Sequence, residues 1–231
     1  EDVNDNTPVF VSAASVRVPE DTPPRSAVAT VRAVDEDSGP NGHVSYHLND
    51  TSGGTFSIDS RSGEMYLEKT LDREEADTLT VAVTAVDGGS PQRSAIVSLT
   101  VHVEDVNDHD PEMLQSSYSL AVREDVPRGA ALLQLQARDR DAGPNGQVRY
   151  VLTQASPFQV DSVRGVVTVR HQLDREKESN YTLILTAVDL GSTPRSATAI
   201  VSVSVLDVND FLGASHWMQR DNKSMYDLVS L

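Results

Sequence analysis

The stretch Asp-Val-Asn-Asp at residues 105–108 decides how this chain is organised, because the same four residues stand again at 2–5 and at 207–210. Each copy begins roughly 100 residues after the one before it, which is the usual size of a single domain. A motif that returns at a fixed period marks a chain built from tandem structural units. The sequence therefore predicts two repeats, each ending in this motif.

Four further motifs return in the same order, so the repeat does not depend on any one of them. The pairs are Val-x-Glu-Asp at 18–21 and 122–125, Asp-x-Asp-x-Gly-Pro-Asn-Gly at 35–42 and 139–146, Leu-Asp-Arg-Glu at 71–74 and 173–176, and Ala-Val-Asp at 85–87 and 187–189. Chance does not produce such a series of matches at a nearly constant offset.

Between these motifs, apolar residues alternate with small or polar ones. The alternation covers residues 27–34, 79–86 and 95–103 in the first repeat, and 131–137, 181–188 and 197–205 in the second. A period of two with many Val and Thr residues indicates half-buried β-strands, and the Gly-Pro-Asn-Gly motifs indicate turns. The chain is therefore predicted to be all-β, with two tandem seven-stranded Greek-key sandwiches of the immunoglobulin-like kind.

The motifs also set the expected boundaries along the chain. They predict a linker from a preceding repeat at 1–8, a first repeat at 9–105, a short linker at 106–111 and a second repeat at 112–210. Residues 211–231 restore neither the strand alternation nor any of the motifs, and they contain the one Trp of the chain. We expect these residues to form a disordered C-terminal tail.

Composition excludes several classes of protein. The chain has 19 Lys and Arg residues against 35 Asp and Glu residues, a net charge of −16, which argues against a nucleic-acid partner. It has no Cys, which excludes disulfides, thiolate metal sites and a Cys nucleophile. No apolar stretch is long enough to span a bilayer and the start is no signal peptide. We expect a membrane contact only through a transmembrane segment of a longer parent protein.

The acidic residues gather in the repeated motifs, where they suit calcium, a hard cation that takes six to eight oxygen ligands. Eight carboxylates are expected around the 106–111 linker, and they would repel one another strongly without cations. They are Glu20, Asp72, Glu74, Asp105, Asp108, Asp139, Asp141 and Asp189. The alternative is that each acid caps its own turn. That alternative explains one acid well, but it does not explain eight on matched turns around a single linker.

These motifs closely resemble the extracellular repeats of the cadherin superfamily over residues 1–210, with the Fat and Dachsous arrays or the protocadherins as the nearest types. The resemblance implies a cluster of Ca²⁺ ions at each complete junction between repeats. It implies that Glu20, Asp72, Glu74, Asp105 and Asp108 hold the upper ions. It also implies that Asn107, Asp139, Asp141 and Asp189 hold the lower one, that Asp141 bridges, and that Val106, His109 and Asn145 give backbone carbonyls.

The linker departs from the family pattern at one place. The pattern Asn-x-Pro, present at residues 6–8, is replaced by His109-Asp110-Pro111. His109 is tolerable there if it contributes only its carbonyl, and the sequence assigns no role to Asp110.

The resemblance also implies two half-sites, each belonging to a junction of which this chain holds one side. The first half-site consists of Asp2, Asn4, Asp5, Asn6, Asp35, Asp37, Asn41 and Asp87, and the second of Glu124, Asp174, Glu176, Asp207, Asn209 and Asp210.

The resemblance implies calcium-dependent cell–cell adhesion by an extracellular segment at the plasma membrane. Its partners would be other cadherin ectodomains, bound homophilically or heterophilically. A structural spacer with no adhesive surface of its own is the main alternative. An accessory module of a secreted enzyme would need a catalytic constellation, and none is visible, so we expect neither an enzyme nor a small-molecule substrate.

Three other sequence features are weak evidence for a function. Residues 35–39 look superficially like an EF-hand loop but lack its spacing and helices. His43 and His47 lack a third metal ligand. Asn49, Asn180 and Asn222 stand in glycosylation sequons, which are credible only in an exported chain.

Overall fold

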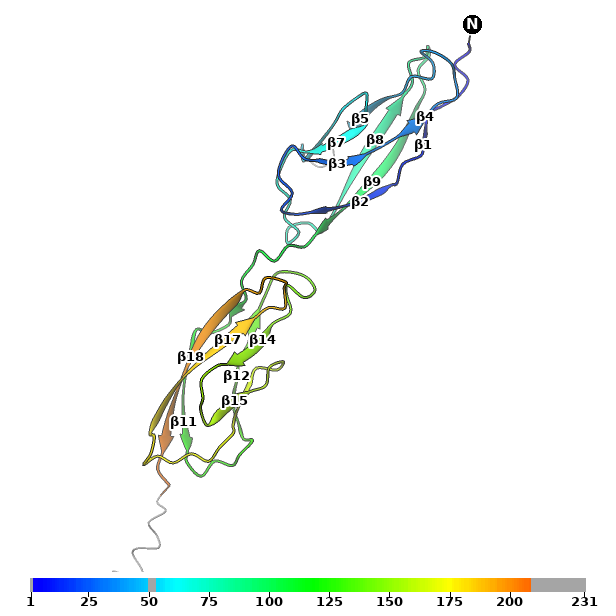
Figure 1. The fold of residues 1–231 in the computed structure, drawn as a ribbon. Coiled ribbons are helices and arrows are strands. Elements are labelled where there is room, and N and C mark those ends of the chain that lie inside the picture. The colour runs from blue at the N-terminus through cyan, green and yellow to red at the C-terminus, as the bar shows by residue number, and fades with distance from the viewer. Residues whose placement is uncertain (1, 50–52, 209–231) are drawn as a thin grey trace, which may run out of the picture. The chain divides into compact units, whose positions relative to one another are not determined.

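The computed structural model describes residues 2–49 and 53–208, which fall into two compact units that divide after Asp108 (Figure 1). Every regular element in those residues is a β-strand, so the predicted all-β class is confirmed. No helix in the described part of the chain is long and apolar enough to cross a bilayer. The predicted tail at 211–231 lies outside the described residues.

The first unit is a two-layered sandwich. One layer is the four-stranded sheet β2-β9-β8-β5 and the other is the three-stranded sheet β3-β7-β6, while β1 pairs with β4. The strands are β1 (Val9–Phe10), β2 (Ser15–Pro19), β3 (Ala27–Thr30), β4 (Ala33–Val34), β5 (Ser45–Asn49), β6 (Phe56–Ile58), β7 (Glu64–Leu67), β8 (Thr78–Val86) and β9 (Ser94–Glu104).

The second unit repeats this arrangement strand for strand. Its sheets are β11-β18-β17-β14 and β12-β16-β15, with β10 paired to β13. The strands are β10 (Glu112–Met113), β11 (Ser117–Arg123), β12 (Ala131–Gln134), β13 (Ala137–Arg138), β14 (Arg149–Leu152), β15 (Phe158–Val160), β16 (Val166–Val169), β17 (Asn180–Val188) and β18 (Ser196–Leu206).

The core of each unit follows from the period-two pattern. On β8, Val81, Val83 and Ala85 are fully buried, while the residues between them face outward. Such alternation places one face of a strand on the core and the other toward solvent. Each unit also buries a tyrosine whose hydroxyl oxygen accepts a backbone hydrogen bond of 2.8 Å, Tyr46 from Ala33 and Tyr150 from Ala137.

The stretch 27–34 was predicted as one strand, but the structure breaks it into β3 and β4. The backbone N–H of Val31, between them, donates to the carbonyl of Gly63 at 2.9 Å, and the pairing with β7 shifts register between Ala27 and Ala29. The second half then pairs with β1 instead. The predicted strand thus takes part in two different sheets, with β7 through its first half and with β1 through its second.

The first long strand of each unit lies beside its last strand and runs parallel to it. In the first unit β2 pairs with β9 from Ser15 and Thr100 to Pro19 and Glu104. In the second unit β11 pairs with β18 in the same way. All other strand pairs are antiparallel. The acidic motifs follow or precede these strands, so they lie at the two ends of each sandwich.

Candidate metal centre

The N-terminal end of the first unit brings the residues 2–6 against two loops of the sandwich. The side-chain amide of Asn4 donates to Asp87 Oδ2 at 3.1 Å. Asn6 donates twice to Asp37, from its backbone N–H to Oδ2 at 3.1 Å and from Nδ2 to Oδ1 at 2.5 Å. These bonds join the beginning of the chain to residues more than thirty positions away.

The remaining residues of this predicted half-site lie in the same place. Asp2 Oδ2 accepts from the backbone of Ser38 at 2.9 Å and from Asn41 Nδ2 at 3.1 Å. Asp5 Oδ1 accepts from Asn6 at 3.1 Å, and Asp35 Oδ1 accepts from the backbone of Asp37 at 3.0 Å. The structure therefore gathers all eight predicted residues at one end of the unit.

The loop that carries Asp35 and Asp37 closes on itself at a glycine. A Cβ added to Gly42 would lie 2.1 Å from the carbonyl oxygen of Asp37, so no other residue fits without moving the loop. Gly146 stands in the same relation to Asp141, at 1.9 Å. The last Gly of Gly-Pro-Asn-Gly is thus required by the close approach of the backbone that presents the acids.

The N-terminal end of the second unit has the same architecture. Asp139 Oδ1 accepts from the backbone of Asp141 at 3.0 Å, as Asp35 does from Asp37. Asp189, like Asp87, is 1% exposed. Its carboxylate accepts from the backbone of Gly191 at 2.8 Å and of Arg195 at 2.8 Å. Leu190 donates to the carbonyl of Pro144 at 3.0 Å, which joins the loop of Asp189 to the loop that contains Asn145.

His109 takes the place of Asn6 and makes the same pair of bonds. Its backbone N–H donates to Asp141 Oδ2 at 3.3 Å, and its ring Nδ1 lies 2.9 Å from Asp141 Oδ1. We assign the proton of the imidazole to Nδ1, because an ionised carboxylate only accepts hydrogen bonds. The imidazole N–H therefore reproduces the amide N–H of asparagine. The sequence assigned His109 only a carbonyl, and the role of its ring was missed.

Asp110, which had no role in the sequence, pairs with Arg195. The distance from Arg195 Nη1 to Asp110 Oδ1 is 2.9 Å, and the two side chains are 41% and 64% exposed. The backbone of the same arginine donates to Asp189. Asp110 therefore fastens the linker to the loop behind Asp189.

The C-terminal end of each unit is organised by one buried glutamate. Glu20 is 6% exposed and accepts from the backbone N–H groups of Val106 at 2.7 Å and Arg73 at 2.8 Å. Glu124 is 7% exposed and accepts from Val208 at 2.7 Å and Arg175 at 2.9 Å. Each glutamate thus ties the chain leaving the last strand to the Leu-Asp-Arg-Glu turn.

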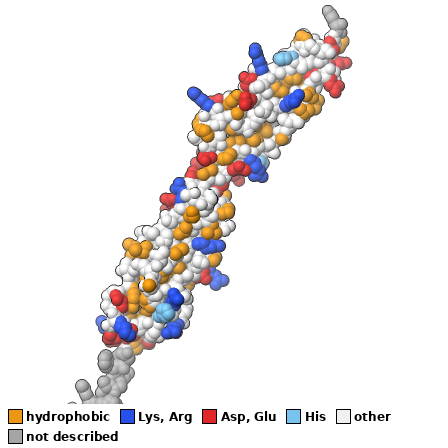
Figure 2. Space-filling view, viewed as in Figure 1, with side chains coloured by type: hydrophobic (Ala, Val, Ile, Leu, Met, Phe, Trp, Pro, Cys, Tyr) orange, Lys and Arg blue, Asp and Glu red, His pale blue; other side chains and the backbone are white. Residues whose placement is uncertain are grey.

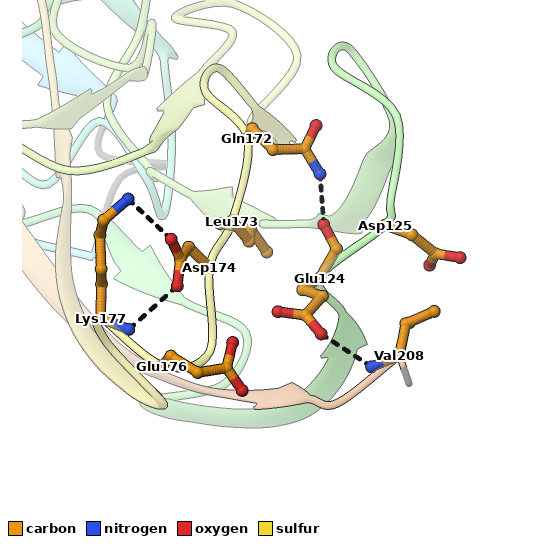
Figure 3. A pocket seen from close by; sticks show the side chains of 8 residues that line it. All are labelled: Glu124, Asp125, Gln172, Leu173, Asp174, Glu176, Lys177 and Val208. Carbon is orange, nitrogen blue, oxygen red and sulfur yellow. Dashed lines mark hydrogen bonds and ion pairs between the residues drawn. The ribbon is translucent and has the colours of Figure 1, made fainter. Parts of the chain in front are cut away.

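Two groups of acids form around these glutamates. In the first unit, carboxylate oxygens of Glu20, Asp72 and Glu74 lie within 4.8 Å of one another. In the second unit, Glu124, Asp174 and Glu176 line a hollow of about 520 Å³, with Val208 and Lys177 at its edge (Figure 3). Acidic side chains are prominent at the ends of the units in the space-filling view (Figure 2).

Cations of the chain itself lie on these acids. Arg73 Nε is 2.6 Å from Asp105 Oδ1, and its Nη2 contacts Glu74. Lys177 Nζ is 2.7 Å from Asp174 Oδ2 (Figure 3). These cations were not predicted as partners of the acids, although the Arg of Leu-Asp-Arg-Glu was the available signal.

Hydrogen bonding keeps several of these acids ionised. Backbone hydrogen bonds from Val208 and Arg175 lower the pKa of Glu124. For Asp37 and Asp87, burial works to raise the pKa, but hydrogen bonds from Asn6 in one case and from Arg93 and Gly89 in the other bring it below its usual value. All three carboxylates are therefore negatively charged at neutral pH.

Among the described residues of these sets, the side-chain oxygens Asn4 Oδ1, Asp35 Oδ2 and Asp139 Oδ2 are buried without a hydrogen-bond partner. Burying an oxygen of this kind is costly unless something compensates it. Asp35 and Asp139 occupy equivalent places in the two repeats, so the feature recurs. Oxygen-only sets rich in carboxylates are the donors that Ca²⁺ prefers, and the residues present fit that ion.

The structure leaves part of the predicted site untested. Asn209 and Asp210 lie outside the described residues. The complete junction combines residues of both units, and it remains a prediction.

Comparison with known proteins identifies the repeats. A sequence model of the cadherin domain matches residues 14–104 and 118–206. The chain belongs to the cadherin family. Protocadherin Fat 4 of Mus musculus is 41% identical over 214 residues, which are 91% of this chain and 4% of that protein. Protocadherin-16 of Homo sapiens is 43% identical over 218 residues, which are 93% of this chain and 7% of that protein. This cadherin chain therefore spans a small fraction of the relatives it matches.

Solved structures agree with the cadherin fold. Mouse clustered PcdhgC3 EC1-3 matches with a TM-score of 0.82 and 32% identity, covering 90% of this chain and 70% of that one. Mouse Cadherin-23 EC22-24 matches with a TM-score of 0.75 and 31% identity, covering 90% and 67%.

Proposed function

We propose that this cadherin chain is a calcium-binding segment of an adhesive ectodomain, and that Ca²⁺ at its repeat ends makes adhesion calcium-dependent. The observation that carries the proposal is the recurrence of a buried, unpartnered carboxylate oxygen at Asp35 and Asp139. A polar atom without a partner is rare in folded proteins. Its presence at the same place in both repeats argues for a cation-binding role rather than for an irregularity of one loop.

The resemblance to other cadherin repeats supports the following assignment of ligands in the complete site. At the C-terminal end of the first repeat, we assign the upper ions to Glu20, Asp72, Glu74, Asp105 and Asp108. At the N-terminal end of the second, we assign the lower ion to Asn107, Asp139, Asp141 and Asp189. The carbonyls would come from Val106, His109 and Asn145. Both sets include residues of the short linker at 106–111, so we infer that one group of ions neutralises both. Bound Ca²⁺ would then hold consecutive repeats in one geometry.

We propose that each of the two half-sites also binds Ca²⁺ together with a neighbouring repeat. The set at residues 2–6, 35–41 and 87 would be completed by a preceding repeat, and the set around Glu124 by a following one. A half-site leaves water to fill the rest of the calcium shell, so we expect weaker binding there.

The calcium affinity expected for these sites implies that the protein acts outside the cell. Calcium sites of extracellular modules have dissociation constants on the order of 10⁻⁴–10⁻³ M, so they fill outside cells and stay empty in cytosol. We infer an extracellular location at the plasma membrane, with other cadherin ectodomains as partners and no catalytic role.

Thermal unfolding tests the proposal. Millimolar Ca²⁺ should raise the melting temperature of the chain, whereas the same concentration of Mg²⁺ should raise it much less, because Mg²⁺ gives up its waters reluctantly. Asp139→Asn should reduce the shift, since it weakens a ligand with little change of shape. A melting temperature that does not respond to Ca²⁺ would overturn the proposal.

A further inference from the structure

The outer face of the sheet β11-β18-β17-β14 carries a pair of facing isoleucines. Ile184 on β17 lies directly opposite Ile200 on β18, and the two are 44% and 49% exposed. Val151 on β14 is 39% exposed and lies opposite Thr186, diagonal to Ile184. Side chains at directly opposite positions lie about 5 Å apart, so these residues form one aliphatic patch.

The first unit does not have this patch, although its strands pair in the same way. Ala82 and Ser98 face each other where the second unit has Ile184 and Ile200. His47 lies opposite Thr84, as Val151 lies opposite Thr186. The equivalent face holds a large exposed aliphatic at Ile96, but that residue faces a threonine. The aliphatic patch is therefore particular to the second repeat and not a requirement of the fold.

The outward strand positions of the same face carry no negative charge, and Asp125, which follows β11, is paired with Arg123 at 2.7 Å. The outward positions of its four strands hold Ser, Thr, Asn and aliphatic residues with two arginines, Arg123 and Arg149, and none is Asp or Glu. The whole chain has a net charge of −16, so two copies repel wherever carboxylates meet. A face without carboxylates is where two copies can approach, and small Ser and Thr side chains let two sheets pack closely.

The size of the face fits a weak contact between copies. Its four strands have 7, 11, 9 and 4 residues, which at about 3.3 Å per residue and about 4.8 Å between strands gives a face of roughly 500 Å². Two such faces would bury on the order of 1,000 Å² in total, the size of a weak or transient interface. A contact of this size without charged pairs is expected to be weak and dependent on concentration.

We propose that this face, centred on Ile184 and Ile200, docks against the same face of a second copy of the chain. The contact would be isologous, with the aliphatic patch of each copy covering that of the other. The inference rests on the proposed adhesive function and names the surface through which the chain would associate. It also separates the adhesive segment from the spacer alternative, which has no such surface.

Sedimentation equilibrium of the whole chain in millimolar Ca²⁺ tests the proposal. Asn180 is a sequon on this face, so the chain is produced without glycans. The unsubstituted chain should associate at high micromolar concentration. The double variant Ile184→Ser, Ile200→Ser should associate at least tenfold more weakly, whereas Ile96→Ser, the matched exposed isoleucine of the first unit, should behave as the unsubstituted chain does. Equal association of all three, or no association of the unsubstituted chain, overturns the proposal.

Cross-linking gives a second readout, which reports the face through which two copies are in contact. The chain has no Cys, so Ser202→Cys introduces one thiol beside Ile200. Mild oxidation should give a disulfide-linked dimer from Ser202→Cys and much less from Thr100→Cys, the equivalent position in the first unit. Equal yields would contradict the assignment of the face.

The Ca²⁺-dependent rise in melting temperature is measured on every variant. A monomeric chain that keeps this rise would refute the docking face alone. A chain without the rise would refute the calcium proposal, whatever its association state.

Discussion

Arg73 and Asp105 are joined by a 2.6 Å hydrogen bond from the guanidinium Nε to Oδ1, at the C-terminal end of the first unit. The same guanidinium contacts Glu74, and the arginine is about one-sixth exposed, with 17% of its side chain accessible. Two of the predicted calcium ligands therefore already have a cation of the chain beside them. A Ca²⁺ ion that binds these carboxylates competes with Arg73.

Replacing Arg73 should separate calcium affinity from calcium-free stability. We expect Arg73→Gln to bind Ca²⁺ several-fold more tightly, because no guanidinium competes for Asp105 and Glu74. The same variant should melt at a lower temperature in chelator, since its carboxylates lose their partner. Calorimetric titration and thermal unfolding measure the two effects. Arg175→Gln, at the exposed equivalent position, is the control. A loss of calcium affinity in Arg73→Gln would show that the arginine orients the ligands instead.

His109 should be replaceable by asparagine but not by alanine. Asparagine can donate to Asp141 Oδ1 as Asn6 donates to Asp37, so His109→Asn should leave Ca²⁺ binding within about twofold. His109→Ala removes the donor that orients Asp141 and should weaken Ca²⁺ binding by roughly 3- to 10-fold, which corresponds to about one ordinary hydrogen bond. Titration of both variants decides this. Equal affinities for the alanine and asparagine variants would mean that only the backbone of His109 matters.

Asp105 and Asp207 occupy equivalent places but should differ in importance. Asp105 is followed by the ligands of the second repeat, whereas Asp207 is followed by residues without the repeat motifs. In about 10 mM Ca²⁺, a site with a submillimolar dissociation constant adds a few kcal/mol, or a rise on the order of 10 °C. Asp105→Ala should remove more than half of that rise and Asp207→Ala little of it. Equal losses would show that residues after Asp207 complete a second site.

Acid should destabilise both units through a turn that holds none of the predicted calcium ligands. Asp59 Oδ1 accepts from the backbone of Ser62 at 2.7 Å and of Arg61 at 2.9 Å, and Asp161 Oδ1 accepts likewise from Arg164 and Val163. These bonds lower the pKa of both carboxylates below 3.8 in the folded chain. Their stabilisation is complete above the unfolded-state pKa and is lost as the pH falls through the lower, folded-state pKa.

The acid effect can be measured in chelator, where calcium ligands bind no ion. Between about pH 5 and pH 3, Asp59→Asn and Asp161→Asn should each show a smaller loss of melting temperature than the unsubstituted chain. Asp21→Asn, which alters an exposed carboxylate, is the control. Identical slopes in all four proteins would contradict the assignment.

The repeats and their core could be predicted because both depend on local pattern. The alternation at residues 79–86 gave β8 to within one residue, since a half-buried strand must place every second side chain on the core. The break at Val31 could not be read in the same way. It arises from a bond to Gly63, a distant residue that local periodicity does not reveal. The parallel pairing of β2 with β9 is likewise a choice of partner across the whole unit.

The sequence predicted which acidic residues belong to the sites. It did not predict the hydrogen bonds and ion pairs that they make. Recurrence of Asp and Glu at a constant offset selected the residues that the structure gathers at each end. The donor on the ring of His109 and the position of the Arg73 guanidinium depend on rotamers and on neighbours distant in sequence. The spacing of the motifs gives no information about rotamers or about neighbours that are distant in sequence.

The parallel pairing of first and last strands determines how each repeat carries tension. A pull on the two ends of a unit draws β2 toward its start and β9 toward its end, so the two strands slide along each other in opposite senses. The hydrogen bonds between them are evenly spaced along the pair and are loaded together in shear. An antiparallel pair pulled at its open end would peel apart one bond at a time. Each repeat is therefore built to resist stretching along its length, and the same holds for β11 and β18.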